Sequence, residues 1–162
     1  INYLTLLLMI NKFFLTVIIS VILTHCGFAP IYTGPSKEVI ILRSEIIGNK
    51  DLAFNLEKKL NFKKDEKNLN AYIFKAQIYD TSENSLIDTR GIPTEEIIKL
   101  TVSYQFQDKN GVVIFQDAIT KDKRVSVTDN LSNNIIIKNN EKKILLDSII
   151  QNILFKSRIS LN

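Results

Sequence analysis

Two side chains capable of chemistry stand next to each other near the start of the chain, His25 and Cys26. They are the only histidine and the only cysteine among 162 residues, and both lie at the end of a strongly apolar segment. If the chain is cleaved between them, the remaining domain has no histidine, and its only thiol stands at the new amino terminus. That composition excludes serine–histidine and cysteine–histidine nucleophiles, imidazole acid–base catalysis and zinc sites built from His or Cys.

The remaining candidates for catalysis are carboxylates, and the most visible pair is Glu95-Glu96. Adjacent acids of this kind are more typical of a solvated loop than of acid–base chemistry. The five glycines are scattered along the chain and form no phosphate-binding loop. We therefore expect no enzyme, no cofactor and no metal site. A hydrolase that uses these two glutamates is the less favoured alternative.

Basic and acidic residues are mixed along the chain, with 21 Lys and Arg against 17 Asp and Glu. Nucleic acid is not an expected partner, because a nucleic-acid-binding protein concentrates its basic residues and interleaves aromatic ones. The strongest basic cluster is Lys121, Lys123 and Arg124, and strand alternation places both lysines on one face and the arginine on the other. Such residues suit anionic headgroups or phosphates, and they also protect a sheet edge from unwanted pairing.

The first 25 residues have the pattern of a signal peptide. Their apolar core is the stretch FFLTVIISVIL, residues 13–23, and Lys12 directly precedes it. Met9 lies three residues before that lysine, so we interpret Met9 as the true start of the protein. The alternative is an uncleaved membrane-spanning helix over residues 3–24, which would bury Lys12 near the middle of the bilayer at a cost of roughly 2.5 to 3.5 kcal/mol.

Leu23-Thr24-His25-Cys26 resembles a bacterial lipobox, in which an aliphatic residue and two small residues precede the cysteine that is lipidated. The resemblance implies cleavage before Cys26 and attachment of acyl chains to it, which anchors a protein stably when more than one chain is present. A free or buried thiol is the alternative. Gly27, in place of Asp, favours sorting to the outer membrane. Residues 26–36 are rich in Gly and Pro and predict a lipidated tether.

Residues 37–162 have the length and composition of a single α+β domain. In its first half, β-branched runs and period-2 alternation indicate strands, and Asn49 precedes a helical apolar stripe that it can cap. The pattern predicts a strand, a helix, a charged loop, a strand and a long loop, in the order 37–46, 49–60, 62–68, 72–80 and 81–95.

The clearest pattern is the alternation of apolar and polar residues over 98–107, which predicts a half-buried strand. The segment Asp108-Lys109-Asn110-Gly111 is a hairpin turn, and a second strand follows over 112–127. Residues 129–140 are rich in asparagine, and periodicity does not assign their short apolar run, 135–137. Residues 141–159 have a continuous apolar face and predict a helix, and the alternative is that this helix begins earlier, at the apolar run. The expected fold is α+β, with two helices on one face of a four-stranded, mostly antiparallel or mixed sheet in the order β-α-β-β-β-α.

Three segments resemble the LPS-assembly lipoprotein family (LptE) in its alphaproteobacterial form. The first is CGFAPIY, residues 26–32, and the second is GIPTEEIIKLTVSYQFQDKNGVVIF, residues 91–115. The third is the polar segment from Val125 into the last helix. Their order and spacing are similar to those of the family and cover most of the exported domain.

This resemblance implies a non-enzymatic lipoprotein, anchored at the periplasmic face of the outer membrane, that plugs and helps assemble the β-barrel lipopolysaccharide translocon (LptD-like). It also implies two helices on a four-stranded sheet. By charge and position we expect lipopolysaccharide contacts at Arg90, Lys121, Lys123 and Arg124. The alternative is a periplasmic lipid-binding or transporter-accessory lipoprotein that has no barrel partner.

Overall fold

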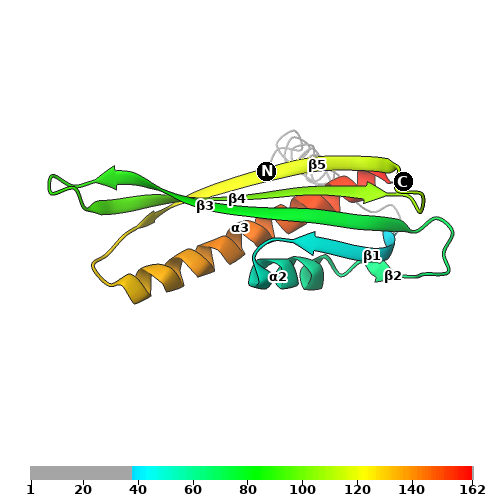
Figure 1. Ribbon diagram of the computed structural model, residues 1–162, viewed down its shortest axis with the longest axis horizontal. Coiled ribbons are helices and arrows are strands. Elements are labelled where there is room, and N and C mark those ends of the chain that lie inside the picture. Colours follow the sequence, from blue (N-terminus) through cyan, green and yellow to red (C-terminus); the bar gives the residue numbers. More distant parts are fainter. Residues whose placement is uncertain (1–37, 162) are drawn as a thin grey trace, which may run out of the picture. The chain divides into compact units, whose positions relative to one another are not determined.

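The structure is a computed structural model that describes residues 38–161. Within these residues, five strands form one sheet and two helices pack on it (Figure 1). In chain order the elements are β1 (Ile40–Ile47), α2 (Lys50–Leu60), β2 (Lys63–Lys64), β3 (Tyr72–Ile87), β4 (Pro93–Gln107), β5 (Val113–Ser126) and α3 (Leu131–Ser160). The predictions for the signal peptide, Met9, the tether and Cys26 lie outside the described residues.

The sheet is mixed and has the strand order β2-β1-β3-β4-β5. β1 pairs in parallel with β2 and β3, and the pairs β3–β4 and β4–β5 are antiparallel. The predicted α+β class and mixed sheet are confirmed. The prediction of four strands in the order β-α-β-β-β-α is wrong, because β2 adds a strand after α2. β2 has only two residues, both exposed, so it leaves no periodic signal in the charged segment that we interpreted as a loop.

Both helices cover the same face of the sheet (Figure 1). The predicted alternation in β4 is confirmed, because its helix-facing residues are 0–3% exposed. These residues are Ile98, Leu100, Val102, Tyr104 and Phe106. They join leucines of α2 and leucines and isoleucines of α3 in one apolar core. No helix within residues 38–161 has the length and apolar character needed to cross a membrane.

α2 begins and ends as its sequence predicts. The side chain of Asn49 accepts hydrogen bonds from the backbone N–H groups of Asp51 and Leu52, and Asn61 ends the helix in the left-handed conformation with φ 44°. Gly48 precedes the cap with φ +142°, and a Cβ there would lie 2.8 Å from the carbonyl oxygen of Ile78. Only glycine therefore fits the turn that brings α2 beneath the sheet.

The long loop predicted over 81–95 is instead the end of a hairpin. β3 continues to Ile87 and β4 begins at Pro93, which leaves a turn whose geometry Asp88 fixes. Its Oδ1 accepts hydrogen bonds from the backbone N–H groups of Arg90 and Ile92, at 2.9 and 2.8 Å, and Gly91 has φ +83°. The two strands are mostly exposed there. Their backbones pair with each other although β3 has polar side chains at these positions, so no apolar alternation marks the strand in the sequence.

α3 begins ten residues earlier than the predicted start at 141, at Leu131. Asn130 caps the helix by accepting from the N–H of Asn133. Asn134 is 6% exposed and exchanges hydrogen bonds with the backbone of Thr128 at 3.0 and 2.7 Å. The asparagines that obscured the pattern thus anchor the first turn of the helix.

Candidate functional site

The predicted basic cluster lies on β5, which forms one edge of the sheet. Lys121 and Lys123 pair with the buried residues Leu100 and Ile98 of β4, so both lysines are on the face that α3 covers. Arg124 is on the opposite face, as alternation along the strand requires. The structure therefore places the two lysines together and separates the arginine from them.

These three cations differ in their partners. The Nζ of Lys123 lies 3.9 Å from Glu141 Oε2 of α3, and Arg124 lies 3.9 Å from Glu95 Oε1. Lys121 is half-buried and has no hydrogen-bond or ion-pair partner among the described residues. Lys121 is thus the cation of this cluster with charge available for an anionic group.

Arg90 is not part of the β5 cluster. It lies in the β3–β4 turn, which extends beyond the end of β5 (Figure 1). Its side chain is 75% exposed. Its guanidinium pairs with Asp88 at 2.8 and 2.9 Å. Backbone N–H donation from Ile92, and then donation from Arg90, lowers the pKa of the Asp88 carboxyl. Arg90 therefore stabilises its own turn and carries little unpaired charge.

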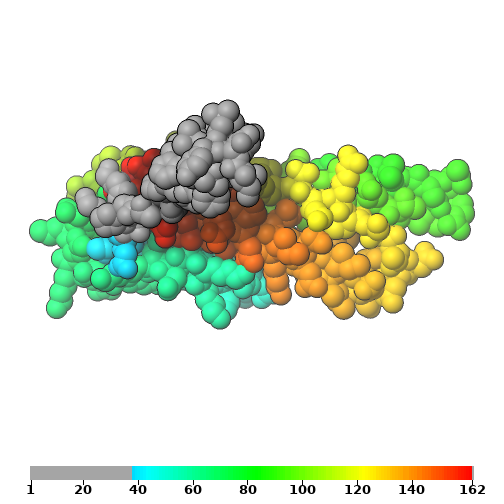
Figure 2. All heavy atoms as spheres, turned by 180° about the vertical axis from the view of Figure 1, so that it is seen from behind, coloured from blue at the N-terminus to red at the C-terminus, as the bar shows by residue number. Residues whose placement is uncertain are grey.

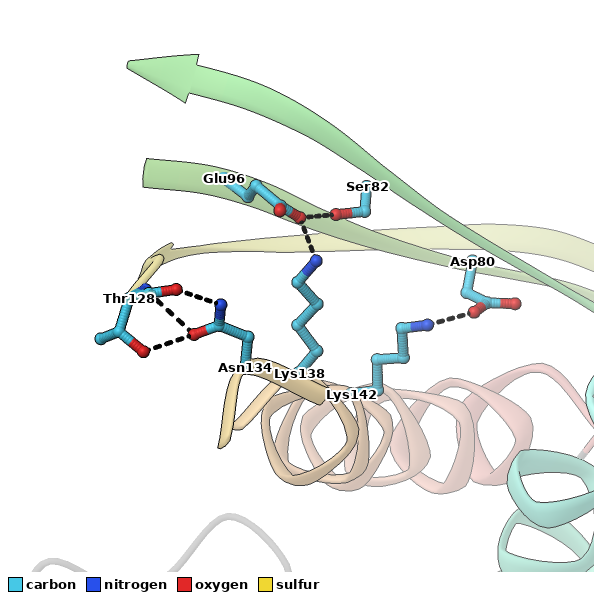
Figure 3. A network of polar contacts seen from close by, with 7 residues as sticks. All are labelled: Asp80, Ser82, Glu96, Thr128, Asn134, Lys138 and Lys142. Atoms are coloured by element: carbon cyan, nitrogen blue, oxygen red, sulfur yellow. Dashed lines mark hydrogen bonds and ion pairs between the residues drawn. The ribbon is translucent and has the colours of Figure 1, made fainter. Parts of the chain in front are cut away.

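A polar network that sequence reasoning missed joins the first half of α3 to the sheet (Figure 3). Lys142 donates to Asp80 of β3 at 2.5 Å, and Lys138 pairs with Glu96 of β4 at 2.6 Å. Ser82 also donates to Glu96. Donation from Lys138, and then from Ser82, lowers the pKa of Glu96. A helix predicted from residue 131 would have placed Lys138 and Lys142, four residues apart, on one face.

Glu95 and Glu96 do not form a joint carboxylate site. They are consecutive in a strand, so their side chains project to opposite faces of the sheet. On one face Glu95 lies near Arg124, and on the other Glu96 binds Lys138. Neither is placed to share a substrate or a proton with the other. The described residues also contain no group of three or more His, Cys, Asp or Glu arranged to hold a metal ion.

The face of the sheet opposite the helices has a shallow hollow of about 580 Å³. Its lining crosses β1, β3, β4 and β5 and combines apolar surface with polar side chains, among them Gln77, Ser103, Gln105 and Gln116. At its rim Glu45 pairs with Arg43 at 2.9 Å and with Lys75 at 3.2 Å. Hydrogen bonds, from Lys75 first and then Arg43, lower the pKa of Glu45. The hollow can accept hydrogen-bonding groups, and its charges already compensate one another.

Comparisons with known proteins find the fold among bacterial lipoproteins of solved structure. A minor lipoprotein from Acinetobacter baumannii matches 77% of this chain and 94% of its own, with 18% identity and a TM-score of 0.58. Lipoprotein B from Nitrosomonas europaea, described as uncharacterized, matches 76% and 87%, with 12% identity and a TM-score of 0.53. Rare lipoprotein B from Shewanella oneidensis matches 71% and 96%, with 10% identity and a TM-score of 0.51. The chain matches no protein-family model and no curated protein sequence.

Proposed function

We propose that this protein is a non-enzymatic, lipid-anchored protein of the outer membrane that serves as plug and assembly partner of the β-barrel lipopolysaccharide translocon. One observation carries the proposal: the chain has the fold of several bacterial lipoproteins over nearly their whole length, rare lipoprotein B among them. The segment CGFAPIY, residues 26–32, and the hairpin segment 91–115 support it through their resemblance to LptE. In this proposal the anchor is on Cys26.

Within this function, β5 contacts the phosphates of lipopolysaccharide. Lys121 offers an unpaired ammonium group, and the ion pair of Lys123 with Glu141 is long, at 3.9 Å. Arg124 presents its charge on the other face of the same edge strand. Ammonium and guanidinium groups bind phosphate by charge-assisted hydrogen bonds. Arg90 is a weaker contact in this proposal, because Asp88 already neutralises it.

Co-purification tests the barrel partner. The full-length protein, tagged after its last residue and expressed in its native bacterium, is expected to bring down an outer-membrane β-barrel protein in a stoichiometric amount. An unrelated outer-membrane lipoprotein with the same tag serves as control. Recovery with an inner-membrane ATPase complex alone, or recovery with no partner, contradicts the barrel role and favours the periplasmic lipid-binding alternative.

A charge reversal tests the lipopolysaccharide contacts. Lys121→Glu combined with Lys123→Glu is expected to weaken binding of purified lipopolysaccharide by about tenfold or more, because it replaces two attractive charges with two repulsive ones. The matched control is Lys58→Glu with Lys143→Glu, which changes net charge equally at two exposed helix positions. Binding measured by fluorescence titration should be nearly unchanged in that control. Equal losses in both variants would show a non-specific effect of net charge and contradict the assignment.

A further inference from the structure

α3 contacts the sheet through two surfaces of different chemistry. In its second half, Leu145, Leu146, Ile149, Ile150 and Ile153 are 0–7% exposed and form the apolar core with the strands. The first half, residues 131–142, we call the α3 arm. The arm's polar contacts with the sheet are made by Lys138 and Lys142, which Figure 3 shows, and by Glu141, which lies near Lys123.

The surface of the sheet beneath α3 also changes from apolar under the second half of the helix to more polar under the arm. Rows of paired residues that cross β3, β4 and β5 are apolar beneath the second half, for example Ile78, Val102 and Ile119. The next rows place Asp80 and Ser82 on β3, and Lys121 and Lys123 on β5. Apolar contact beneath the arm is thus limited to Ile98 and Leu100 of those same rows and to Val125 in the row of Glu96, and Ile137 of the arm packs against this cluster.

The arm also has fewer neighbours. α2 lies beside the second half of α3, where Lys59 bonds to Asp147, and the arm extends past α2 toward the end of the molecule that carries the β3–β4 turn (Figures 1 and 2). The sheet is therefore the one layer that holds the arm within the described residues. The outer side of the arm exposes Leu131, Ile135 and Ile136, at 72%, 52% and 58%.

The balance of forces differs between the two halves. Partly buried ion pairs hold the arm only modestly, because much of their attraction offsets the cost of taking each charge out of water. Lys142 and Asp80 are 20% and 24% exposed, and Lys138 and Glu96 are 28% and 13% exposed, so all four regain hydration when the arm leaves. Opening the arm uncovers Ile98 and Leu100 of the sheet, whereas opening the second half would also expose helix residues that are 0–2% exposed, such as Leu146, Ile149 and Ile153, and would cost more apolar burial.

We propose that the α3 arm, residues 131–142, opens from the sheet as a unit while residues 145–157 stay packed, and that in the closed state it restricts access to Lys121, which is half-buried. The closed arm also places a carboxylate beside the second lysine, because Glu141 Oε2 is buried without a hydrogen-bond partner and lies 3.9 Å from the Nζ of Lys123. Opening removes this carboxylate and uncovers Ile98 and Leu100 beside two lysines, a surface suited to an acylated anion. The significance of this access rests on the proposed function, whereas the opening itself does not.

Amide hydrogen exchange of the full chain, followed by mass spectrometry, tests the opening. Amides of residues 135–142 are expected to exchange about tenfold or more faster than those of 149–156. Raising NaCl from about 0.05 M to about 1 M should widen the difference, because salt screens the ion pairs that close the arm. Equal exchange in both halves at every salt concentration would overturn the proposal.

Two matched variants sharpen the test. Asp80→Asn combined with Glu96→Gln keeps the shapes of the side chains and removes both acids that hold the arm, so exchange over 135–142 should rise about tenfold without change at 149–156. The control Asp117→Asn breaks the bond between Lys156 and Asp117, 2.6 Å long, in the second half of the same helix, and should leave the arm unaffected. A uniform rise along α3 in the double variant would contradict a separate arm.

Modification of Lys121 by an amine-reactive reagent tests the restricted access. In the variant with Asp80→Asn and Glu96→Gln, the rate at which Lys121 is labelled is expected to rise together with the rate of amide hydrogen exchange in the arm. Faster exchange with unchanged labelling would overturn the restriction. Failure to recover a barrel partner would refute the proposed function and leave these two measurements unaffected, so the two failures are distinguishable.

Discussion

Phe106→Ala is expected to lower the free energy of unfolding by about 3 to 5 kcal/mol, the range for removing a fully buried phenylalanine and leaving a cavity. Phe106 is 0% exposed and lies in β4, between β3 and β5. Its ring centroid lies 5.1 to 6.5 Å from five others, those of Phe62, Tyr72, Phe74, Tyr104 and Phe115. Several of these contacts are edge-on, an arrangement that adds stability beyond buried area.

Denaturant unfolding followed by circular dichroism measures this effect, with Phe54→Ala as control. Phe54 lies off the apolar stripe of α2 and is 65% exposed, so its removal should change stability by less than about 0.5 kcal/mol. Similar losses for the two variants would mean that the aromatic cluster at Phe106 is not the centre of the core.

Local sequence patterns were sufficient to predict the strands and helices that bury one regular face, such as β4 and α2. β4 shows this best, because its period of two coincides with complete burial of one face over 98–106. α2 was predicted at both ends for a similar reason, since Asn49 and the stripe through Leu52, Leu56 and Leu60 act within a few residues of each other. In both elements the signal and the contact that it describes are close in sequence.

The two hairpin turns show where local reading was incomplete. Asp108 accepts from the N–H groups of Asn110 and Val112, both at 2.8 Å, and Gly111 has φ +85°. The Asp88 turn has the same geometry, with glycine again three residues after aspartate. The Asn-Gly pair identified the turn at Asp108. The two turns have in common an Asp at the start and a Gly three positions later, and this shared pattern was not used for the turn at Asp88.

Long-range pairing accounts for the rest of the differences. Nothing near Lys63 indicates that it pairs with Ile40, and the bond from Lys142 to Asp80 joins residues 62 positions apart. Sequence alone could place Lys121 and Lys123 on one face of β5. It could not show that α3 covers that face or that Glu141 lies near Lys123, because the packing of the helix on the sheet depends on contacts between residues distant in sequence.

Cys26→Ser is expected to abolish acylation and to remove the protein from the outer-membrane fraction. In the proposed function the anchor consists of several acyl chains on this single cysteine, and each buried methylene contributes about 0.8 kcal/mol, so the chains together dominate membrane affinity. A serine hydroxyl does not replace the thiol in that modification. Mass spectrometry of the mature amino terminus, together with fractionation of the two membranes, measures both consequences.

His25→Ala is the matched control, since it changes the neighbouring residue and restores a small side chain at a position where the lipobox normally has one. It should keep the acylated Cys26 terminus at the same mass and increase the yield of processed protein. An intact segment through His25 in the unmodified protein, or an unmodified Cys26 at the mature amino terminus, would contradict lipid anchoring. The first outcome would favour the uncleaved helix over residues 3–24, which then has to hold Lys12 within the bilayer at a cost of roughly 2.5 to 3.5 kcal/mol.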